Sequence, residues 1–372
     1  TLDSHIAGPA ERAEARLIHS VPGLSLSVHA AAEWSEDGAA LAAAKAAVAG
    51  ADIIVVTMLF LDEHIRALLP DLQARRDACD AMVCLISGAE VVKLTKLGGL
   101  DMAKPASGMM ALMKKLRGAK KPGASAGSNQ MSMLRRLPRI LKFLPGKAQD
   151  LRSYFLCMQY WLAGSDDNVE AMVAYLVDGY ARGPRGHLAG ALAPAAPVEY
   201  PETGLYHPDL AERMTTDAAA IPGPANPVGT VGLLVMRAYI LSGDTAHYDS
   251  VIRALEAKGL RVLPAFASGL DGRPAIDAFF RDGARVTIDA MLSLTGFSLV
   301  GGPAYNDSGA AEEILAALDV PYIAAHALEL QRLDEWALGG SGLSPVETTI
   351  MVAIPEIDGA TGPMVYGGRI GA

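Results

Sequence analysis

Short runs of apolar residues alternate along the chain with stretches whose apolar positions recur at helical spacing. Buried strands are indicated at 52–60 and 81–87, where aliphatic side chains follow one another with few charges. A shorter alternating stretch at 24–30 predicts a further strand. Because strand and helix alternate at short spacing, we expect a parallel sheet covered by helices. The helices of this first part are expected at 9–18, 36–49 and 62–76.

The same rhythm returns in the second half of the chain. Strands are predicted at 228–236, 260–266, 290–294 and 321–325, and a last extended segment at 364–366. We therefore expect an α/β protein with two parallel-sheet domains in tandem, the first extended by a basic helical arm. The helices of the second part are expected at 244–258, 274–280, 310–318 and 345–354.

A proline-rich segment separates the two halves. Eight prolines fall between Arg182 and Pro227, which leaves little room for long elements and favours a connector with extended segments. The predicted domains are a head at 1–185, whose helical arm runs from about 104 to 180, a connector at 186–227, and a second α/β domain at 228–372. The first four residues have the character of a strand end before the helix at 9–18, so we expect residues upstream of Thr1 that complete a first strand. The Gly-Gly-Arg at 367–369 looks like interior sequence, so the second domain is expected to continue beyond Ala372.

The stretch from Lys93 to Arg152 concentrates positive charge. It holds fourteen Lys and Arg residues against Asp101 and Asp150, a formal charge of +12, whereas the whole chain carries −9. Such a surface attracts anionic partners. Within it, helical spacing at 90–97 ends at Gly98-Gly99, Gly and Ser at 118–128 indicate a loop, and Pro138 should bend a helix at 131–144. Further helices are expected at 107–117, 149–163 and 167–180, the last with Ser165 as N-cap.

Cysteine usage and hydropathy place the chain among reduced, soluble proteins. The three cysteines, at 79, 84 and 157, have apolar neighbours and no C-x-x-C spacing, so buried free thiols are expected. The longest apolar run, at 53–61, is far shorter than the roughly 20 residues of a membrane span. No signal peptide opens the chain, so we expect a cytoplasmic protein.

Common nucleotide-binding and histidine metal-binding motifs are absent from the sequence. Neither a phosphate loop of the form G-x-x-x-x-G-K-[ST] nor a G-x-G-x-x-G after a strand is present, so no nucleotide site is assigned. The eight histidines show no H-E-x-x-H or H-x-x-x-H spacing, so we assign no metal site, although His187 and His207 both fall in the proline-rich segment.

Candidate binding residues follow the predicted strands of the second domain. Open α/β sheets bind ligands in a crevice at the carboxyl ends of their strands. The alternative is that the glycines only turn the chain and that the threonine caps a helix. The residues that the crevice hypothesis selects are Arg237, Ser268, Thr295, Gly301 and Gly302.

Long motifs in both halves resemble one family. The segments 93–102, 137–145, 147–150 and 159–165, and then 243–248, 292–303, 318–322 and 354–359, occur in the order seen in the large porphyrin-binding H subunit of magnesium chelatase. The resemblance extends over essentially the whole chain and covers the N-terminal part of a longer family member. Ala- and Gly-rich usage favours a bacterial member of the bacteriochlorophyll type.

The resemblance implies a function. Members of this family insert Mg²⁺ into protoporphyrin IX, and ATP is hydrolysed by partner subunits of the AAA+ type, which fits the absence of a phosphate loop. Mg²⁺ and the porphyrin are then substrates, and this segment binds no cofactor. The resemblance assigns no catalytic residue here, because it places the catalytic body of the family beyond Ala372.

Alternative roles stay open for this segment. It either gates porphyrin entry and docks partner subunits, or binds the porphyrin directly through basic side chains that pair with the two propionates. The large subunit of a cobaltochelatase and a purely structural docking module are further alternatives. The basic arm is expected to serve a porphyrin, an acidic partner subunit or a membrane surface, but not a nucleic acid, because its one aromatic residue offers little stacking. Its central residues are Arg135, Arg136, Arg139 and Lys142.

Overall fold

The chain folds into two compact units in a computed structural model. The first unit contains residues 1–199 and 241–243, and the second contains 200–240 and 244–372. Both are built from helices and sheets, which confirms the predicted α/β class. The finer division into a head, a connector and a second domain stays a prediction. The structure describes residues 1–2, 4–34, 38–104, 137–138, 140–142, 145–302, 305–340 and 342–370.

A small sheet forms the centre of the first unit. Its strands are ordered β1-β2-β3-β4. The two predicted buried strands pair in parallel, with Ile53 opposite Ala81 and Thr57 opposite Leu85. The next two strands are short and antiparallel. The bounds are β1 Ile53–Thr57, β2 Ala81–Leu85, β3 Lys96–Leu97 and β4 Leu100–Asp101.

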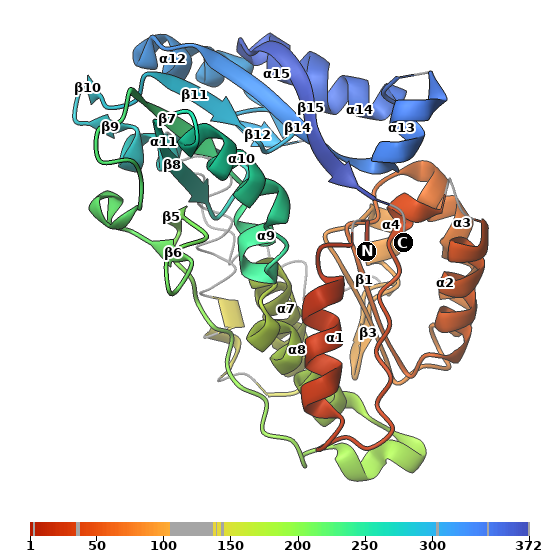
Figure 1. The fold of residues 1–372 in the computed structure, drawn as a ribbon. Helices are drawn as coiled ribbons and strands as arrows, with labels where there is room; N and C mark the ends of the chain where they lie inside the picture. The colour runs from red at the N-terminus through yellow and green to blue at the C-terminus, as the bar shows by residue number, and fades with distance from the viewer. Residues whose placement is uncertain are drawn as a thin grey trace. The chain divides into compact units, whose positions relative to one another are not determined.

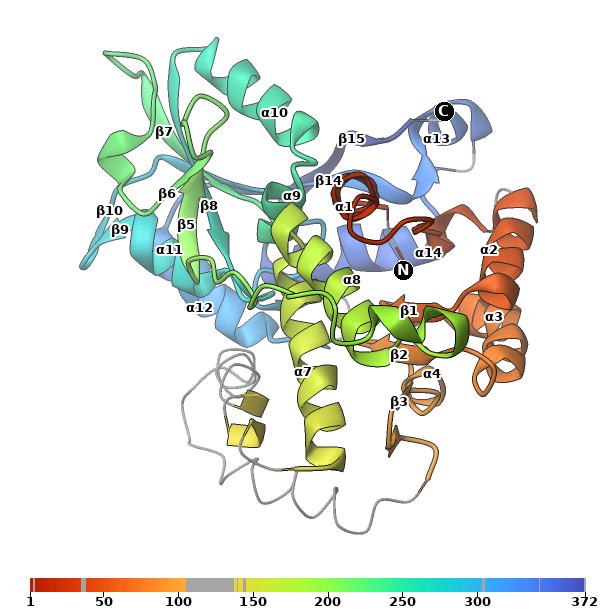
Figure 2. The same cartoon turned by 90° about the horizontal axis from the view of Figure 1, so that it is seen from below.

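Helices cover both faces of this sheet. Alternate residues of β1 and β2 point to opposite cores, one shared with α2 and α3 and the other with α7 and α8. Helix α1 packs on α8 through Ala10, Ala13 and Val169, and α7 and α8 run side by side (Figure 2). The bounds are α1 Ala7–Leu17, α2 Gly38–Gly50, α3 Asp62–Arg75, α4 Ala89–Val92, α7 Lys147–Ala163, α8 Asp166–Tyr180, and the 3₁₀ turns η1 Ala31–Glu33 and η2 Gly183–Leu188.

The strand predicted at 24–30 is not formed. Its residues lie outside every sheet of the described part of the chain. The backbone N–H of Leu26 donates to the side chain of Glu14 at 3.0 Å instead of to a neighbouring strand. Alternation alone was misleading here, because it indicates an extended backbone and not a partner for it.

The helix predicted at 90–97 is also shorter than expected. It ends at Val92, and the chain turns back as the β3–β4 hairpin around Gly98, whose φ is +53°. The Thr95 hydroxyl explains the turn, because it accepts from the N–H of Cys84 at 3.1 Å and lies within 3.3 Å of the Cys84 carbonyl. This buried contact draws the chain onto the edge of β2.

The predicted helical hairpin of the arm is confirmed. Gly164 ends α7 in the left-handed conformation, and the Ser165 side chain accepts from the N–H of Asn168 as an N-cap. Leu137 and Leu141 are buried against the core of this unit. The predicted helix at 107–117, the loop at 118–128, most of the helix at 131–144, and Arg135, Arg136 and Arg139 lie outside the described residues.

A seven-stranded mixed sheet forms the second unit. Its order is β15-β14-β11-β7-β8-β5-β6, and the first five strands in that order are parallel. β5 and β6 extend it antiparallel at the β8 edge. The bounds are β5 Thr203–Tyr206, β6 Met214–Thr215, β7 Gly229–Leu234, β8 Leu260–Ala267, β11 Ala290–Ser293, β14 Tyr322–Arg332 and β15 Thr361–Arg369, with small hairpins of β9 Arg281–Asp282 and β10 Arg285–Val286, and of β12 Gly301–Gly302 and β13 Tyr305–Asn306.

The helices of this unit divide between the two faces of the sheet (Figure 1). One core joins the sheet to α9 and α10 through Ile240, Tyr248 and Ile252, and the other joins it to α11 and α12. The predicted last helix is three joined pieces, the middle one a π-helix. The bounds are α9 Arg237–Ser242, α10 Ala246–Glu256, α11 Arg273–Phe279, α12 Ser308–Leu318, α13 Leu333–Gly339, α14 Pro345–Glu347, η4 Thr348–Ala353, α15 Ile354–Asp358, and the 3₁₀ turn η3 Ala218–Ala220.

The three cysteines are buried, as predicted. Cys79, Cys84 and Cys157 are free thiols in the cores of the first unit. Burial raises the pKa of Cys84 and of Cys157 to about 12. The thiolate form is therefore disfavoured, and these side chains behave as small apolar groups.

Candidate functional site

The strand order of the second unit reverses at β7. From β7 the chain passes through α10 to β8 on one side, and later places β11 on the other side of β7. α10 packs on one face of the sheet, and α11 and α12 pack on the other. Such a topological switch point is where open α/β sheets leave a crevice at the carboxyl ends of their strands. The geometry thus marks the loops after β7, β8 and β11 as the candidate site.

Two predicted residues follow these strands and make internal contacts. Arg237 follows β7 and is 6 % exposed, and its Nη1 donates to the carbonyl of Pro201 at 3.0 Å. Ser268 follows β8, and its Oγ donates to Glu202. Its backbone N–H also donates to the Glu202 carbonyl at 2.7 Å. Both side chains thus contact the segment that leads into β5.

The third predicted residue, Thr295, lies directly in the crevice. It follows β11, and its hydroxyl is 2.9 Å from the Ser293 hydroxyl. Gly301 and Gly302 do not turn the chain at the end of a parallel strand, as the sequence suggested, because they form β12 and pair with β13. A Cβ on Gly302 would lie 2.4 Å from Cδ1 of Leu270, so this glycine makes room for a leucine of the β8 loop.

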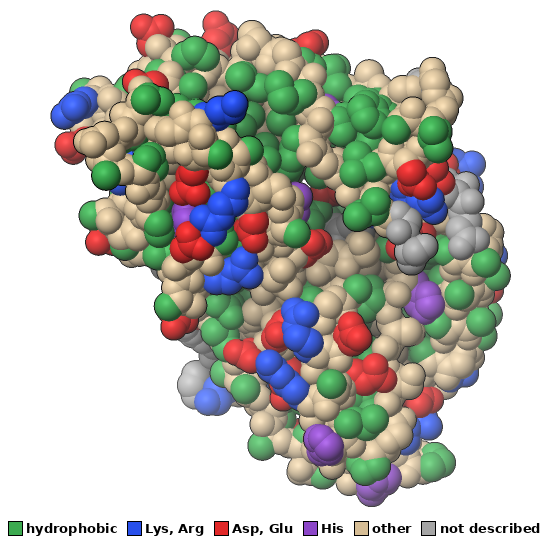
Figure 3. Space-filling view, in the orientation of Figure 1, with side chains coloured by type: hydrophobic (Ala, Val, Ile, Leu, Met, Phe, Trp, Pro, Cys, Tyr) green, Lys and Arg blue, Asp and Glu red, His purple; other side chains and the backbone are tan. Residues whose placement is uncertain are grey.

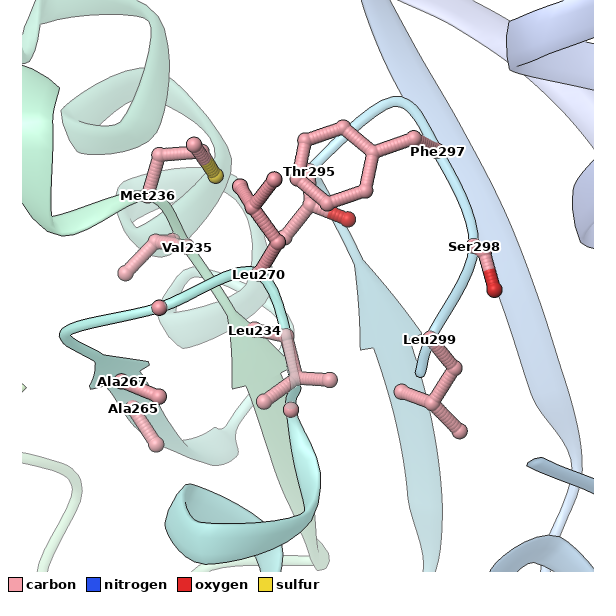
Figure 4. Close-up of a pocket in the computed structure, with 12 residues that line it drawn as sticks. Leu234, Val235, Met236, Ala265, Ala267, Leu270, Thr295, Phe297, Ser298 and Leu299 are labelled. Atoms are coloured by element: carbon pink, nitrogen blue, oxygen red, sulfur yellow. The ribbon is translucent and has the colours of Figure 1, made fainter. Parts of the chain in front are cut away.

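A small pocket opens between these loops, and we call it the switch-point pocket. Figure 4 shows Thr295 and Phe297 of the β11 loop facing Met236 and Leu270. The space open to the centre of a water molecule is about 20 Å³, little more than one water needs. The pocket is lined by Leu234, Val235, Met236, Ala265, Ala267, Gly269, Leu270, Gly272, Thr295, Phe297, Ser298 and Leu299.

Sequence reasoning missed most of this lining. Met236, Leu270 and Phe297 are apolar loop residues, and loops are usually searched for polar groups. The sequence offered one signal, because Leu270 is a large apolar residue in a glycine-rich loop. In the structure its side chain is 46 % exposed. An exposed leucine beside a crevice indicates an apolar contact.

A buried aspartate holds one wall of the pocket. Asp358, at the end of α15, is 2 % exposed. Its Oδ2 accepts from the Ser298 hydroxyl and from the Leu299 N–H, both at 2.7 Å. Because both donors belong to the β11 loop, this carboxylate fixes the loop that carries Thr295 and Phe297.

The lining of the pocket is apolar apart from two hydroxyl groups and carries no ionisable side chain for acid–base or metal chemistry. Its lining includes two hydroxyl side chains, and both already contact the protein. Across the described part of the chain, no three His, Cys, Asp or Glu side chains converge in a way that could hold a metal ion. Helices there also fall short of the length and apolar character that a bilayer crossing requires.

Two histidines of the second unit are fully buried. Nε2 of His207 lies 3.0 Å from Glu256, and its Nδ1 accepts from the N–H of Asp209 at 3.2 Å, so it stabilises a turn. His326, on β14, is 1 % exposed, and neither ring nitrogen has a partner among the described residues. Burial lowers the pKa of His326, and the charge of Glu347 partly opposes this. His187, in contrast, is exposed in η2 and contacts the Pro184 carbonyl.

The lowered pKa values of His326 and His247 predict a loss of stability in acid. Burial also lowers the pKa of His247. An unfolded chain takes up protons below about pH 6.5, whereas the folded imidazoles take them up only at lower pH. We therefore expect the free energy of unfolding to fall as the pH decreases below about 6.5, until the lowered folded pKa values are reached.

Urea unfolding between pH 7.5 and 5 measures this dependence. His326→Gln should flatten the curve, whereas His187→Gln, at an exposed position, should leave its slope unchanged. Identical slopes for the wild type and His326→Gln would contradict the assignment.

Basic and acidic side chains lie interspersed on the face that Figure 3 shows. In the first unit Arg12 pairs with Asp166, with Nε 2.6 Å from Oδ2. In the second unit Arg253 pairs with Asp209, and Arg213 with Asp249 at 3.2 Å. An anionic ligand at these arginines would therefore have to displace carboxylates. Of the four predicted arm residues the structure describes Lys142, which is exposed.

Two family models match this chain. Residues 1–155 match a model described as a domain of unknown function, DUF3479. Residues 158–371, more than half of the chain, match the model described as CobN/Magnesium Chelatase. The chain belongs to the CobN/magnesium chelatase family. The model covers the whole seven-stranded sheet and therefore the switch-point pocket.

Named relatives refine this assignment. The chain is 62 % identical over 369 residues to the magnesium-chelatase H subunit of Cereibacter sphaeroides, covering 99 % of this chain and 31 % of that protein. It is 62 % identical over 371 residues to the protein of the same name from Rhodobacter capsulatus, covering 99 % and 30 %. The aerobic cobaltochelatase protein CobN of a Sinorhizobium species is 30 % identical over 130 residues, covering 35 % and 10 %. The chain spans about a third of the length of the two chelatase H subunits.

Proposed function

We propose that this chain is a segment of the large, porphyrin-binding subunit of a magnesium chelatase. The full enzyme would insert Mg²⁺ into protoporphyrin IX for bacteriochlorophyll synthesis, while partner subunits of the AAA+ type hydrolyse ATP. The observation that carries the proposal is the 62 % identity to two magnesium-chelatase H subunits over 99 % of the chain. The relative named as a cobaltochelatase is similar over a much shorter stretch, which disfavours the cobalt alternative.

Within the enzyme, we assign this segment to porphyrin handling and subunit docking rather than to the chemical step. Metal insertion needs bases that accept the two pyrrole protons and ligands for the metal as it loses water. The switch-point pocket offers neither, because it is lined by apolar side chains and two bonded hydroxyls. Thr295, Gly301, Gly302, Arg237 and Ser268 are proposed to shape and support the substrate-binding face, not to react.

A segment exchange tests the proposed function. The matching third of the C. sphaeroides H subunit is replaced by this chain, and magnesium-porphyrin formation is followed by fluorescence with both partner subunits present. We expect the chimera to insert Mg²⁺ at a rate close to that of the parent subunit. The control chimera carries the aligned 130-residue stretch of the Sinorhizobium CobN protein, which should be impaired. A folded chimera of this chain that inserts no Mg²⁺ would contradict the proposal.

The basic arm is proposed to bind an anionic partner of this enzyme. Lysine and arginine pair strongly with carboxylates such as porphyrin propionates or an acidic subunit surface. The same chimera with Arg135, Arg136, Arg139 and Lys142 changed to Glu should lose affinity for the porphyrin or for a partner subunit. Porphyrin titrations with and without the partners distinguish these two roles. If the affinities for the porphyrin and for the partner subunits are unchanged, the basic side chains only face solvent and the proposed role of the arm is wrong.

A further inference from the structure

The switch-point pocket is too small for a ring and large enough for a substituent. Its open space, about 20 Å³, accommodates the centre of about one water-sized group. A porphyrin macrocycle cannot enter such a space. A methyl or vinyl group that projects from the edge of the macrocycle has the right size.

The chemistry of the lining selects an apolar substituent. Met236, Leu270 and Phe297 line the pocket, and no lining residue is Asp, Glu, Lys, Arg or His. The Thr295 hydroxyl is engaged by Ser293, and the Ser298 hydroxyl by Asp358. A propionate placed here would be a buried charge without a partner, which is strongly unfavourable. The pocket therefore rejects the acidic edge of a porphyrin and accepts its apolar edge.

The rim of the pocket presents an apolar surface to an incoming ligand. Leu270 is 46 % exposed although neighbouring residues of the sheet are buried. Its side chain packs against Gly302, where an added Cβ would lie 2.4 Å from its Cδ1. The opposite wall is the β11 loop, which Asp358 fixes through Ser298 and Leu299. The opening is thus held in place on both sides before a ligand arrives, which lowers the entropic cost of binding.

We propose that the switch-point pocket binds the vinyl-bearing edge of protoporphyrin IX and so reads the substituents of the substrate. This proposal rests on the proposed function. Asp358 is then a positioning residue, because it holds the wall of the pocket without touching the ligand. The two propionates lie at the other edge of the macrocycle, away from this apolar pocket.

A porphyrin series tests the pocket in the full-length subunit carrying this segment, without partner subunits. Protoporphyrin has two vinyl groups, mesoporphyrin has ethyl groups there, and deuteroporphyrin has hydrogens. Fluorescence quenching should show protoporphyrin and mesoporphyrin binding about tenfold more tightly than deuteroporphyrin, the factor expected for one small apolar group in a pocket. Leu270→Asp should remove this difference by weakening the first two porphyrins and leaving deuteroporphyrin unchanged.

Matched variants separate the pocket from general effects. Val228→Asp changes a residue that is 79 % exposed just before β7, at the opposite end of the sheet, and should preserve the series. If Leu270→Asp does not fold, Leu270→Ala and Phe297→Leu replace it in the test. Each should reduce the difference in affinity between protoporphyrin and deuteroporphyrin. Equal weakening of all three porphyrins, or no change in any, would overturn the proposal. An unchanged porphyrin series would also overturn it if a separate assay showed that Leu270→Asp weakens binding of a partner subunit, because the occupant would then be that subunit.

Failure of this inference is distinguishable from failure of the proposed function. If the chimera inserts Mg²⁺ but Leu270→Asp leaves the affinities of the three porphyrins unchanged, the proposed function stands and the role of the pocket is refuted. If the chimera inserts no Mg²⁺ but Leu270→Asp still removes its preference among the three porphyrins, the role of the pocket stands and the proposed function is refuted.

Discussion

Replacing Gly232 by alanine should lower the free energy of unfolding of the second unit by about 3 kcal/mol, the upper end for an overpacked core. Gly232 lies in β7, paired with Met291 on one side and Leu263 on the other. A Cβ at this position would meet three atoms of the Phe280 ring at 2.8 to 2.9 Å. Phe280 is 0 % exposed, so the ring has no free space to move into.

Two opposing effects act at Gly232, and their sizes decide the sign. Alanine restricts the unfolded chain more than glycine does, which favours folding by about 0.4–1 kcal/mol. Contacts below 3.0 Å with a buried ring cost more than this, because either the strand or the ring must shift. The variant is therefore expected to be destabilised.

Urea denaturation of the wild type and three variants measures this effect. Gly269→Ala is the matched control, because its added Cβ would have no atom within 4 Å. Phe280→Leu combined with Gly232→Ala should recover part of the loss, since the smaller side chain relieves the contact. A Gly232→Ala protein as stable as Gly269→Ala would show that the ring yields at little cost.

Replacing Asp358 by alanine should destabilise the second unit by about 3 kcal/mol, because a buried carboxylate that accepts two hydrogen bonds is lost. The Ser298 hydroxyl and the Leu299 N–H each donate to this carboxylate at 2.7 Å. Ser298 and Leu299 are 1 % and 2 % exposed, so water does not readily replace the lost acceptor. The Leu299 N–H would remain buried without an acceptor, whereas the Ser298 hydroxyl can still donate to the Val300 carbonyl at 3.2 Å.

The matched control is a carboxylate at the surface. Asp334 pairs with Arg332, and its side chain is 46 % exposed. Asp334→Ala should therefore change the free energy of unfolding little, because an exposed ion pair is screened by water. Asp358→Asn should fall between the two alanine variants, since it keeps one acceptor oxygen. Similar small losses for Asp358→Ala and Asp334→Ala would refute the role given to the buried carboxylate.

The sequence predicted the central strands well because their burial is nearly continuous. β1, β2, β7, β8 and β11 consist largely of aliphatic residues, and such runs have few alternatives to a covered parallel strand. The sequence did not predict whether an extended segment finds a neighbouring strand to pair with. The segment at 24–30 is extended but has no neighbouring strand, so it joins no sheet. Residues 203–206 of the proline-rich segment form β5, because the edge of β8 offers a pairing partner and places Leu205 opposite Ala265.

The positions of three candidate residues at strand ends were predictable from the sequence, and their contacts were not. Thr295, Ser268 and Arg237 do follow the carboxyl ends of β11, β8 and β7. Their contacts depend on residues distant in sequence, such as Pro201 for Arg237, and no local pattern encodes such a contact. The same holds for Asp358, which fixes a loop 60 residues away. The pocket therefore emerged from tertiary structure and not from a motif.

The antiparallel pairing of β5 with β8 has a consequence for recombinant expression. A shortened protein that starts at Val228 would lack β5 and β6 and leave the backbone groups of β8 unpaired along one side. Unprotected strand edges recruit other chains, so this product is expected to form aggregates. A start at Tyr200 retains both protecting strands and is the shorter version worth expressing.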